Sequence, residues 1–181
     1  MQFLKTEIGA TIQGGGGEII RNIPFRASPC LLKQFLQLLS CQMLQLTTSI
    51  MRTNGLADNI PAYSRNFKVI ATTDTSYGTQ IGSGETNPVA LDDYCLESQL
   101  TTNIAHQAVT VATENPDSST WRLAISRGFL NNGSASVDVK EVGLVVIASG
   151  ASYIMIDRTL YEVSFGVGET LTITHRISIS L

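Results

Sequence analysis

The sequence predicts a mainly β protein: an antiparallel β-sandwich or barrel-like domain with one long N-terminal helix and an N-terminal arm. Three observations support this class. The end of the chain alternates apolar and polar side chains with a period of two, as a strand does. Leucines near the start of the chain follow the spacing of a helix, and a run of four glycines precedes them.

The last stretch, residues 170–181, is the clearest strand. One parity is apolar apart from a histidine and consists of Leu171, Ile173, His175, Ile177, Ile179 and Leu181. The other parity carries threonine, serine and one arginine. Successive side chains of a strand point to opposite faces, so the pattern predicts one apolar face and one hydroxyl-rich face. We expect Leu171, Ile173, Ile177 and Ile179 to be buried together.

Three stretches upstream also have the character of strands. Residues 121–126 alternate, and residues 137–147 are almost continuously apolar after Glu141, as in a strand covered on both faces. Residues 153–156 form a third apolar run, and turns rich in glycine and asparagine separate these stretches. Residues 119–181 are therefore predicted to form consecutive antiparallel strands, a meander that makes up half of a sandwich or barrel.

Residues 24–55 are predicted to hold the one helix, with its regular part over 29–53. Ser28 is placed to cap it, Pro29 suits its first turn, and the Asn-Gly pair at 54–55 offers a stop. Its apolar stripe is so wide that the helix needs cover on more than one side. Its own sheet is the expected cover, with symmetry mates as the alternative. Glutamines along the same stretch argue against a membrane span.

Residues 1–23 show no clear period and include the glycine run at 14–17, which holds no conformation by itself. This segment is predicted to be an extended arm that docks elsewhere, with a neighbouring subunit as the favoured docking site. The chain is thus divided into an arm at 1–23, a helix at 24–55 and a β domain at 56–181.

Charged residues are scarce, at 15% of the 181 residues, whereas about a quarter is usual. Low charge with abundant small polar residues suits a surface that is buried against other chains. It suits equally well a lone β protein with a hydroxyl-coated surface. The net charge of −3 provides no electrostatic footprint for DNA or RNA, so no nucleic-acid partner is expected.

The three cysteines are Cys30, Cys41 and Cys95, and their spacing matches neither a disulfide framework nor a zinc motif. They are expected to be small buried side chains of a protein made in a reducing compartment. The N-terminus has no basic region followed by an apolar one, so no signal peptide is expected.

No residue pattern points to catalysis, to a bound cofactor or to a metal. The stretch 82–86 resembles a phosphate loop but lacks the Lys-Ser/Thr pair and a following helix, so it is interpreted as a turn. His106 and His175 fall in predicted strands, and a buried or interface histidine with a backbone partner is the expectation for each. The chain is therefore predicted not to be an enzyme.

Acidic residues occur in two settings. Asp92, Asp93 and Glu97 are close enough in sequence for a cation site or for acid–base work, but surface turn residues explain them more simply. The adjacent opposite charges at 157–158 and at 140–141 are interpreted as ion pairs or rim charges that contribute little each.

Several blocks of the sequence, taken in order, resemble a known family. The blocks are Ile81-Gly82-Ser83-Gly84-Glu85-Thr86-Asn87-Pro88, Asp92-Asp93-Tyr94-Cys95-Leu96-Glu97-Ser98, Phe129-Leu130-Asn131-Asn132-Gly133-Ser134, Val139-Lys140-Glu141-Val142-Gly143-Leu144, Arg158-Thr159 and Val167-Gly168-Glu169-Thr170-Leu171-Thr172-Ile173. Their succession over residues 67–181 resembles small structural proteins of tailed bacteriophages, including some tail-collar and fibre proteins. The resemblance implies a non-enzymatic part of the virion. It does not extend to the predicted helix and arm.

The leading hypothesis from the sequence is a structural component of a bacteriophage virion, made in the host cytoplasm and oligomerising on the tail, collar or baseplate. A capsid decoration (cement) protein is the alternative. A carbohydrate-binding or hydrolytic β-sandwich is a more distant one, since it needs clustered aromatics or paired carboxylates, and only Trp121 and scattered tyrosines are available. The expected partners are copies of the chain, in a trimer or ring, and other proteins of the tail, portal/collar or capsid. No nucleic acid, membrane, cofactor or metal is expected.

Overall fold

A computed structural model describes residues 3–28, 31–63, 66–69, 73–84 and 89–180. The elements in these residues are β1 (Phe3–Gln13), β2 (Ile19–Ala27), α1 (Lys33–Leu44), β3 (Thr48–Met51), β4 (Ala57–Ile60), β5 (Gly78–Gly82), β6 (Ile104–His106), β7 (Thr110–Asp117), β8 (Thr120–Asn131), β9 (Val137–Ala148), β10 (Ser152–Phe165) and β11 (Thr170–Ser180). The prediction of a mainly β protein with antiparallel strands is confirmed.

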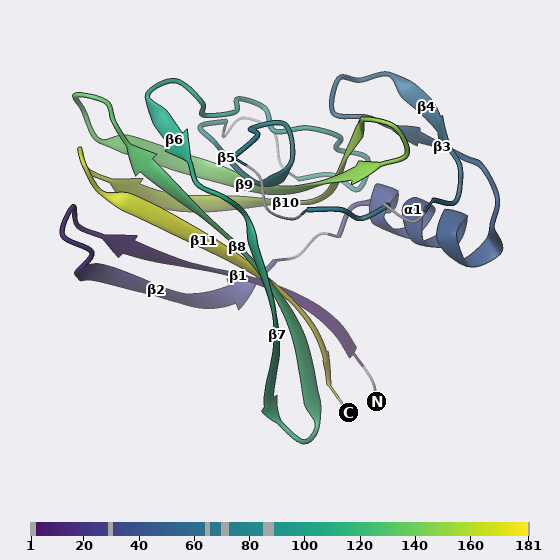
Figure 1. The fold of residues 1–181 in the computed structure, drawn as a ribbon, viewed down its shortest axis with the longest axis horizontal. Coiled ribbons are helices and arrows are strands. Elements are labelled where there is room, and N and C mark those ends of the chain that lie inside the picture. Colours follow the sequence, from purple (N-terminus) through teal and green to yellow (C-terminus); the bar gives the residue numbers. More distant parts are fainter. Residues whose placement is uncertain (1–2, 29–30, 64–65, 70–72, 85–88, 181) are drawn as a thin grey trace.

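The strands form two main sheets and one small hairpin (Figure 1). The larger sheet has the strand order β2-β1-β11-β8-β6, and β7 pairs with another part of β8. The smaller sheet has the order β10-β9-β5, and the hairpin of β3 and β4 contacts α1. Whether the sheets close as a sandwich or a barrel stays a prediction.

The last four strands lie where the alternation predicts them, but they do not form one meander. β8 pairs with β11 in the larger sheet, whereas β9 pairs with β10 in the smaller one. The chain therefore leaves the larger sheet after β8 and returns to it with β11. This path places the apolar face of one strand pair against that of the other, where a flat meander would leave both faces on one surface.

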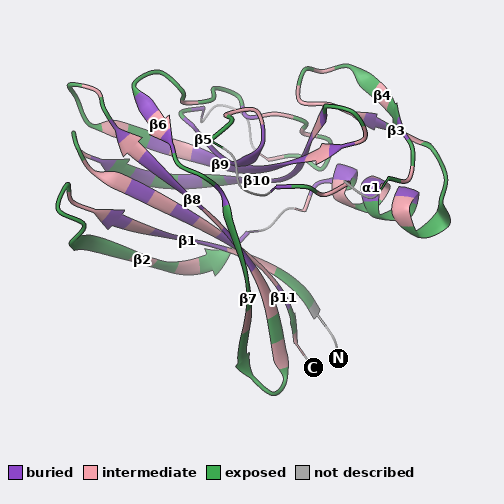
Figure 2. Cartoon of the chain, in the orientation of Figure 1, coloured by how far each residue is buried: buried purple, intermediate pink, exposed green. Residues whose placement is uncertain are grey.

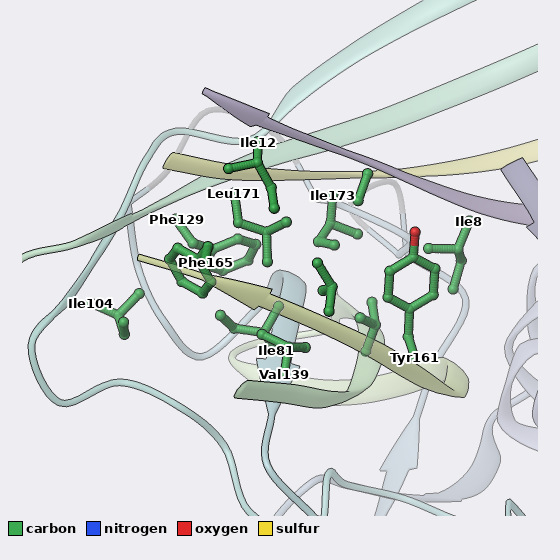
Figure 3. Close-up of a cluster of buried hydrophobic side chains, with 13 residues drawn as sticks. Ile8, Ile12, Ile81, Ile104, Phe129, Val139, Tyr161, Phe165, Leu171 and Ile173 are labelled. Carbon is green, nitrogen blue, oxygen red and sulfur yellow. The ribbon is translucent and has the colours of Figure 1, made fainter. Parts of the chain in front are cut away.

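The two sheets meet in a cluster of buried side chains (Figure 3). The larger sheet contributes Ile8, Phe129 and Ile173, among others, and the smaller sheet contributes Ile81 and Phe165. Full burial of one such side chain stabilises the folded state by about 1.5–3 kcal/mol. This cluster therefore holds the two sheets together.

β11 is buried over only part of its apolar face. Leu171 and Ile173 are fully buried, as expected, but Ile177 is half-buried and Ile179 is exposed. The expectation that all four are buried together is thus wrong for the end of the strand. The reason is that β11 continues past the smaller sheet, as Figures 1 and 2 show.

The predicted N-terminal arm is corrected by the structure, because these residues form a hairpin of the larger sheet. β1 pairs with β11 along its whole length, and β2 pairs with β1. The glycine run is the turn between them. There, Gly14 N–H donates to the Glu18 carbonyl, and Gly17 has a φ of 85°, which favours glycine. The β domain consequently includes the N-terminal residues and does not begin at residue 56.

The predicted long helix is not supported, since α1 covers only Lys33–Leu44. Gln45 takes a left-handed φ of 54°, and the Leu46 N–H donates to the Cys41 carbonyl, which ends the helix. β3 and β4 follow, and the Asn-Gly pair predicted as a helix stop is their turn. Ser28 does not cap the helix, because its hydroxyl donates to Asp157 instead.

α1 packs against its own β domain through one face. Leu38 and Cys41 of this face join a second buried cluster, which includes Ile154 of β10 and Ile125 of β8. Within the described residues, no helix combines the length and apolarity needed to cross a membrane.

Substitution of Ile173 by alanine tests the buried part of β11. We expect Ile173→Ala to lower the free energy of unfolding by about 2–5 kcal/mol, because it removes fully buried methylene and methyl groups and leaves a cavity. The matched control is Ile179→Ala, on the same face of the same strand, which should cost less than about 1 kcal/mol. Urea unfolding measures both values. Equal losses would contradict the division of β11 into a buried and an uncovered part.

Candidate functional site

A cluster of buried charges lies on the outer face of the smaller sheet. Arg158 of β10 is 2% exposed and Glu141 of β9 is 0% exposed. Arg158 Nε donates to Glu141 Oε2 at 3.0 Å, and Arg158 Nη1 donates to Asp93 Oδ2 at 2.7 Å. Burial of a charge is tolerated only when the charge is paired in this way. We call Asp93, Glu141 and Arg158 the outer ionic cluster.

Glu141 also binds the backbone of the loop that follows β5. Its carboxylate accepts hydrogen bonds from the N–H groups of Gly84, Glu97 and Ser98 at 3.3, 3.1 and 2.9 Å. A Cβ at Gly82 or Gly84 would come within 2.5 or 2.7 Å of Glu141 Oε1. Glycine is therefore required at both positions by the close approach of the carboxylate.

The outer ionic cluster joins several blocks that carry the family resemblance. The Gly-x-Gly stretch, Asp93, the block around Glu141 and the Arg-Thr pair at 158–159 meet here, although they are far apart in sequence. The sequence predicts that the charges at 157–158 and 140–141 are ion pairs or rim charges that contribute little each. Rim positions are wrong for Glu141, Asp157 and Arg158, which are buried. Asp93 holds Arg158 and is not a plain surface turn residue.

A second buried polar cluster lies between the sheets, at a bulge in β10. The pairing of β10 with β9 shifts between Met155 and Asp157, which turns the Asp157 side chain inward. Ser28 Oγ donates to Asp157 Oδ2 at 2.9 Å, and Thr159 Oγ1 donates to Asp157 Oδ1 at 3.4 Å. His175 Nε2 lies 3.9 Å from Asp157 Oδ1. We call Ser28, Asp157, Thr159 and His175 the inner polar cluster.

Burial determines the charge state of the inner polar cluster. It raises the pKa of Asp157 to about 7, against the opposing effect of the hydrogen bonds from Ser28 and Thr159. It lowers the pKa of His175 to about 3. Both groups are therefore mainly neutral between these two values, and they do not form an ion pair there.

Serine, aspartate and histidine meet here without the order that nucleophilic catalysis requires. Ser28 donates to Asp157 and not to His175, whose Nδ1 lies 3.3 Å from the Thr79 hydroxyl. In this structure the space beside Asp157 and His175 has no room for a water molecule.

The other histidine is also part of the core. His106 Nε2 lies 3.1 Å from the Leu100 carbonyl, and its ring contacts Phe129 edge-on. A buried histidine with a backbone partner is what the sequence predicts for His106. It does not describe His175, whose polar neighbours are side chains.

The remaining residues considered as metal ligands lie apart from one another where the structure describes them. Cys41 is buried and its thiol donates to the Ile60 carbonyl, Cys95 is half-buried, and Cys30 lies outside the described residues. Asp92 lies on the surface, 4.0 Å from Lys33 Nζ. Within the part of the chain that the structure describes, no three His, Cys, Asp or Glu side chains are grouped as metal ligands.

The larger sheet extends past the smaller one and leaves part of its apolar face uncovered (Figures 1 and 2). Leu4, Ile179 and Trp121 lie in register across β1, β11 and β8, and they are 53%, 48% and 50% exposed. Ile177 and Leu123 are half-buried and form the next row toward the core. We call these five residues the overhang.

The two faces of this end of the sheet differ in charge. By register, the described residues beside the overhang at this end of the face are uncharged, Thr6 and Thr113 included. The charged residues of the same face, Arg26 and Arg127, lie farther along the sheet, in register with Ile8 and Ile173. The opposite face carries the ion pairs Lys5–Glu7 and Arg176–Glu114. A contiguous apolar face without charges is typical of a surface that contacts another molecule.

A second uncovered apolar surface lies on α1, opposite to its buried face. Leu36, Leu39 and Met43 follow the spacing i, i+3, i+7, which places them on one side of the helix. They are 61%, 36% and 74% exposed. We call these three residues the helix stripe. A helix that covers a core normally has polar residues at such positions. The exposure of the stripe shows that the described residues do not cover it.

An open hollow of about 610 Å³ lies at the turn between β7 and β8, beside Trp121. Its other lining residues are polar apart from Ile179, and they are Asn115, Asp117, Ser118, Ser119 and Thr120. The Asp117 carboxylate accepts hydrogen bonds from the N–H and the hydroxyl of Ser119. The hollow thus offers one exposed aromatic ring, but its carboxylate is engaged in its own turn.

Comparison with models of protein families gives no match, and comparisons with curated proteins and with solved structures give none either. The resemblance of the sequence blocks to phage structural proteins therefore stays a prediction.

Substitution of Glu141 by glutamine tests the outer ionic cluster. Glu141→Gln removes one of the two carboxylates that pair with the buried Arg158 guanidinium and leaves only Asp93, so we expect a loss of about 1–3 kcal/mol in the free energy of unfolding. Glu162→Gln, at an exposed position of β10, is the matched control and should change it by less than about 0.5 kcal/mol. Thermal and urea unfolding of both variants provide the measurement. A loss below 1 kcal/mol for the first variant would show that the buried pair is not required.

Asp157 and His175 make opposite contributions to the pH dependence of stability. The pKa of Asp157 rises from 3.8 to about 7 on folding, so its contribution is present below about pH 4 and is lost as the pH rises to 7. The pKa of His175 falls from 6.5 to about 3, so its contribution is present above pH 6.5 and is lost as the pH falls toward 3.

The variants Asp157→Asn and His175→Gln separate these two contributions. Relative to the unsubstituted chain, Asp157→Asn should gain up to about 1.4 kcal/mol of unfolding free energy for each pH unit between pH 4 and 7. His175→Gln should gain in the opposite direction, as the pH falls from 6.5 to 4. Urea unfolding at several pH values between 4 and 7 gives both slopes. Curves that run parallel to that of the unsubstituted chain would contradict the assigned protonation states.

Proposed function

We propose that this chain is a non-enzymatic structural protein that assembles with copies of itself, as a component of a bacteriophage virion. The overhang is the observation that supports self-assembly most directly. The succession of sequence blocks supports the virion and, within it, a position on the tail, collar or baseplate. Capsid decoration is the alternative position.

The overhang favours a protein partner for energetic reasons. Leu4, Ile179 and Trp121 form one row across three strands, and their face is the one that elsewhere makes the core. Each 100 Å² of apolar surface removed from water contributes about 2.5 kcal/mol. Because the residues of the overhang are uncharged, its partner surface does not need charged residues. A suitable partner is an apolar surface of another copy, and each copy has two such surfaces, the overhang and the helix stripe.

The polar groups of the interior favour a structural role over catalysis. In the outer ionic cluster, Glu141 and Asp93 are occupied by Arg158 and by backbone N–H groups of the same chain. In the inner polar cluster, Asp157 and His175 lie where no substrate has room. These groups hold loops and strands in place. The low charge of the whole chain agrees with surfaces that are covered in an assembly.

The mass in solution and the fluorescence of Trp121, the only tryptophan of the chain, test the assembly. We expect the mass to rise above that of one chain as the concentration increases. The emission of Trp121 should shift to shorter wavelengths in parallel, because its half-exposed ring becomes buried. Trp121→Ser should keep the fold and reduce the mass to that of one chain. Sedimentation equilibrium and fluorescence titration measure these effects.

Other outcomes overturn parts of the proposal. The mass of a single chain up to millimolar concentration would exclude self-assembly. A change in Trp121 emission on adding oligosaccharides would favour the carbohydrate-binding alternative, for which the hollow beside this residue is the available site. Mass spectrometry of particles purified from cells that naturally produce the chain tests the virion itself, and absence of the chain from such particles would exclude that role.

A further inference from the structure

The two uncovered apolar surfaces belong to different kinds of secondary structure. The overhang is a sheet face across β1, β11 and β8, and the helix stripe is a ridge on α1. Both are exposed in the same chain, so they do not cover each other there. A ridge of helix side chains on a sheet face is one of the standard ways in which two layers of secondary structure bury apolar surface.

The chain already contains a contact of this kind. α1 packs on β10 of the smaller sheet, and its Leu38 and Cys41 belong to the second buried cluster together with Ile154. Leu123 packs at the margin of the same cluster. Leu123 also belongs to the overhang. The overhang therefore borders the buried cluster to which α1 already contributes, and a second helix on the overhang would extend the same apolar layer.

The two surfaces also match in size and charge. From Leu36 to Met43 the stripe extends along about 10 Å of helix. The row from Leu4 to Trp121 spans two strand spacings, which is also about 10 Å. None of the residues that define either surface is charged. Helix and sheet thus meet without desolvation of an unpaired charge.

We propose that the helix stripe of one copy packs on the overhang of the next copy, in a head-to-tail contact. This inference rests on the proposed self-assembly and specifies its geometry. A head-to-tail contact uses two different surfaces, so each copy has one of each free for further neighbours. It closes into a ring where the rotation between copies permits, and it otherwise continues as a filament.

Two charged substitutions separate the two halves of this contact. Met43→Glu places a charge in the helix stripe and leaves the overhang intact. Ile179→Glu does the reverse. Both positions are exposed in the single chain, so the fold should persist, and urea unfolding verifies this. The matched control is Ile20→Glu on β2, which is similarly exposed at 53% but lies outside both surfaces.

Each of the two variants alone should behave as a single chain, because a buried unpaired charge weakens the contact at least about 100-fold. An equimolar mixture should form a dimer of one copy of each variant. In that dimer the intact overhang of Met43→Glu binds the intact stripe of Ile179→Glu, and no further copy can be added. Ile20→Glu should assemble as the unsubstituted chain does. Sedimentation velocity of the variants alone and mixed gives the masses.

Every other result has a definite meaning. If Met43→Glu still pairs by itself, the overhang binds another overhang, and if Ile179→Glu still pairs by itself, the stripe binds another stripe; either result overturns the head-to-tail contact. A mixture that stays monomeric, or variants that both assemble fully, also overturns it while leaving self-assembly intact. If the unsubstituted chain is itself monomeric, the proposed self-assembly is what fails.

Discussion

The pairing of β11 with β1 on one side and with β8 on the other is the constraint on which the rest of the structure depends. It brings strands from the two ends of the chain side by side at the centre of the larger sheet (Figure 1). Because Leu171 and Ile173 make one face of β11 apolar, the smaller sheet must cover that face. All three strands extend past this cover (Figure 1), and the same alternation therefore continues onto the surface at Ile179.

The buried polar clusters fix parts of the chain that apolar packing alone leaves undetermined. Glu141 and Arg158 fasten the loop after β5 to the smaller sheet, and Asp157 fastens Ser28 before the helix. Such groups add little net stability, because the loss of hydration offsets much of the electrostatic gain. These groups instead select one strand register, since a shifted register would leave a charge unpaired. Most polar atoms of the two clusters are paired within the chain, but Arg158 Nη2 and His175 Nε2 have no hydrogen-bond partner among the described residues.

The uncovered apolar surfaces help to choose between two explanations of the low charge content. A hydroxyl-coated lone protein and a protein covered by neighbours share this composition, but they differ in where large apolar side chains lie. Here Trp121, Leu36 and Met43 are at least half exposed, and they belong to two contiguous surfaces. This distribution favours coverage by neighbours. It also explains why the helix has an apolar stripe wider than its own sheet can cover.

The sequence by itself determined which stretches are strands at the end of the chain, because one apolar face requires a period of two. It also contained the N-terminal strand, since Leu4, Thr6, Ile8, Ala10 and Ile12 share one parity, but the adjacent glycine run masked that signal. The end of the helix was harder to predict from the sequence, because apolar residues continue past Gln45. Only the left-handed conformation of Gln45 ends the helix there. Tertiary structure alone decided the strand partners and the charge pairs. Arg158 meets Asp93 across 65 positions of sequence. The overhang exists because the larger sheet extends past the layer that covers it (Figure 1). Local patterns carry no information about either, since both depend on which distant segments pack together.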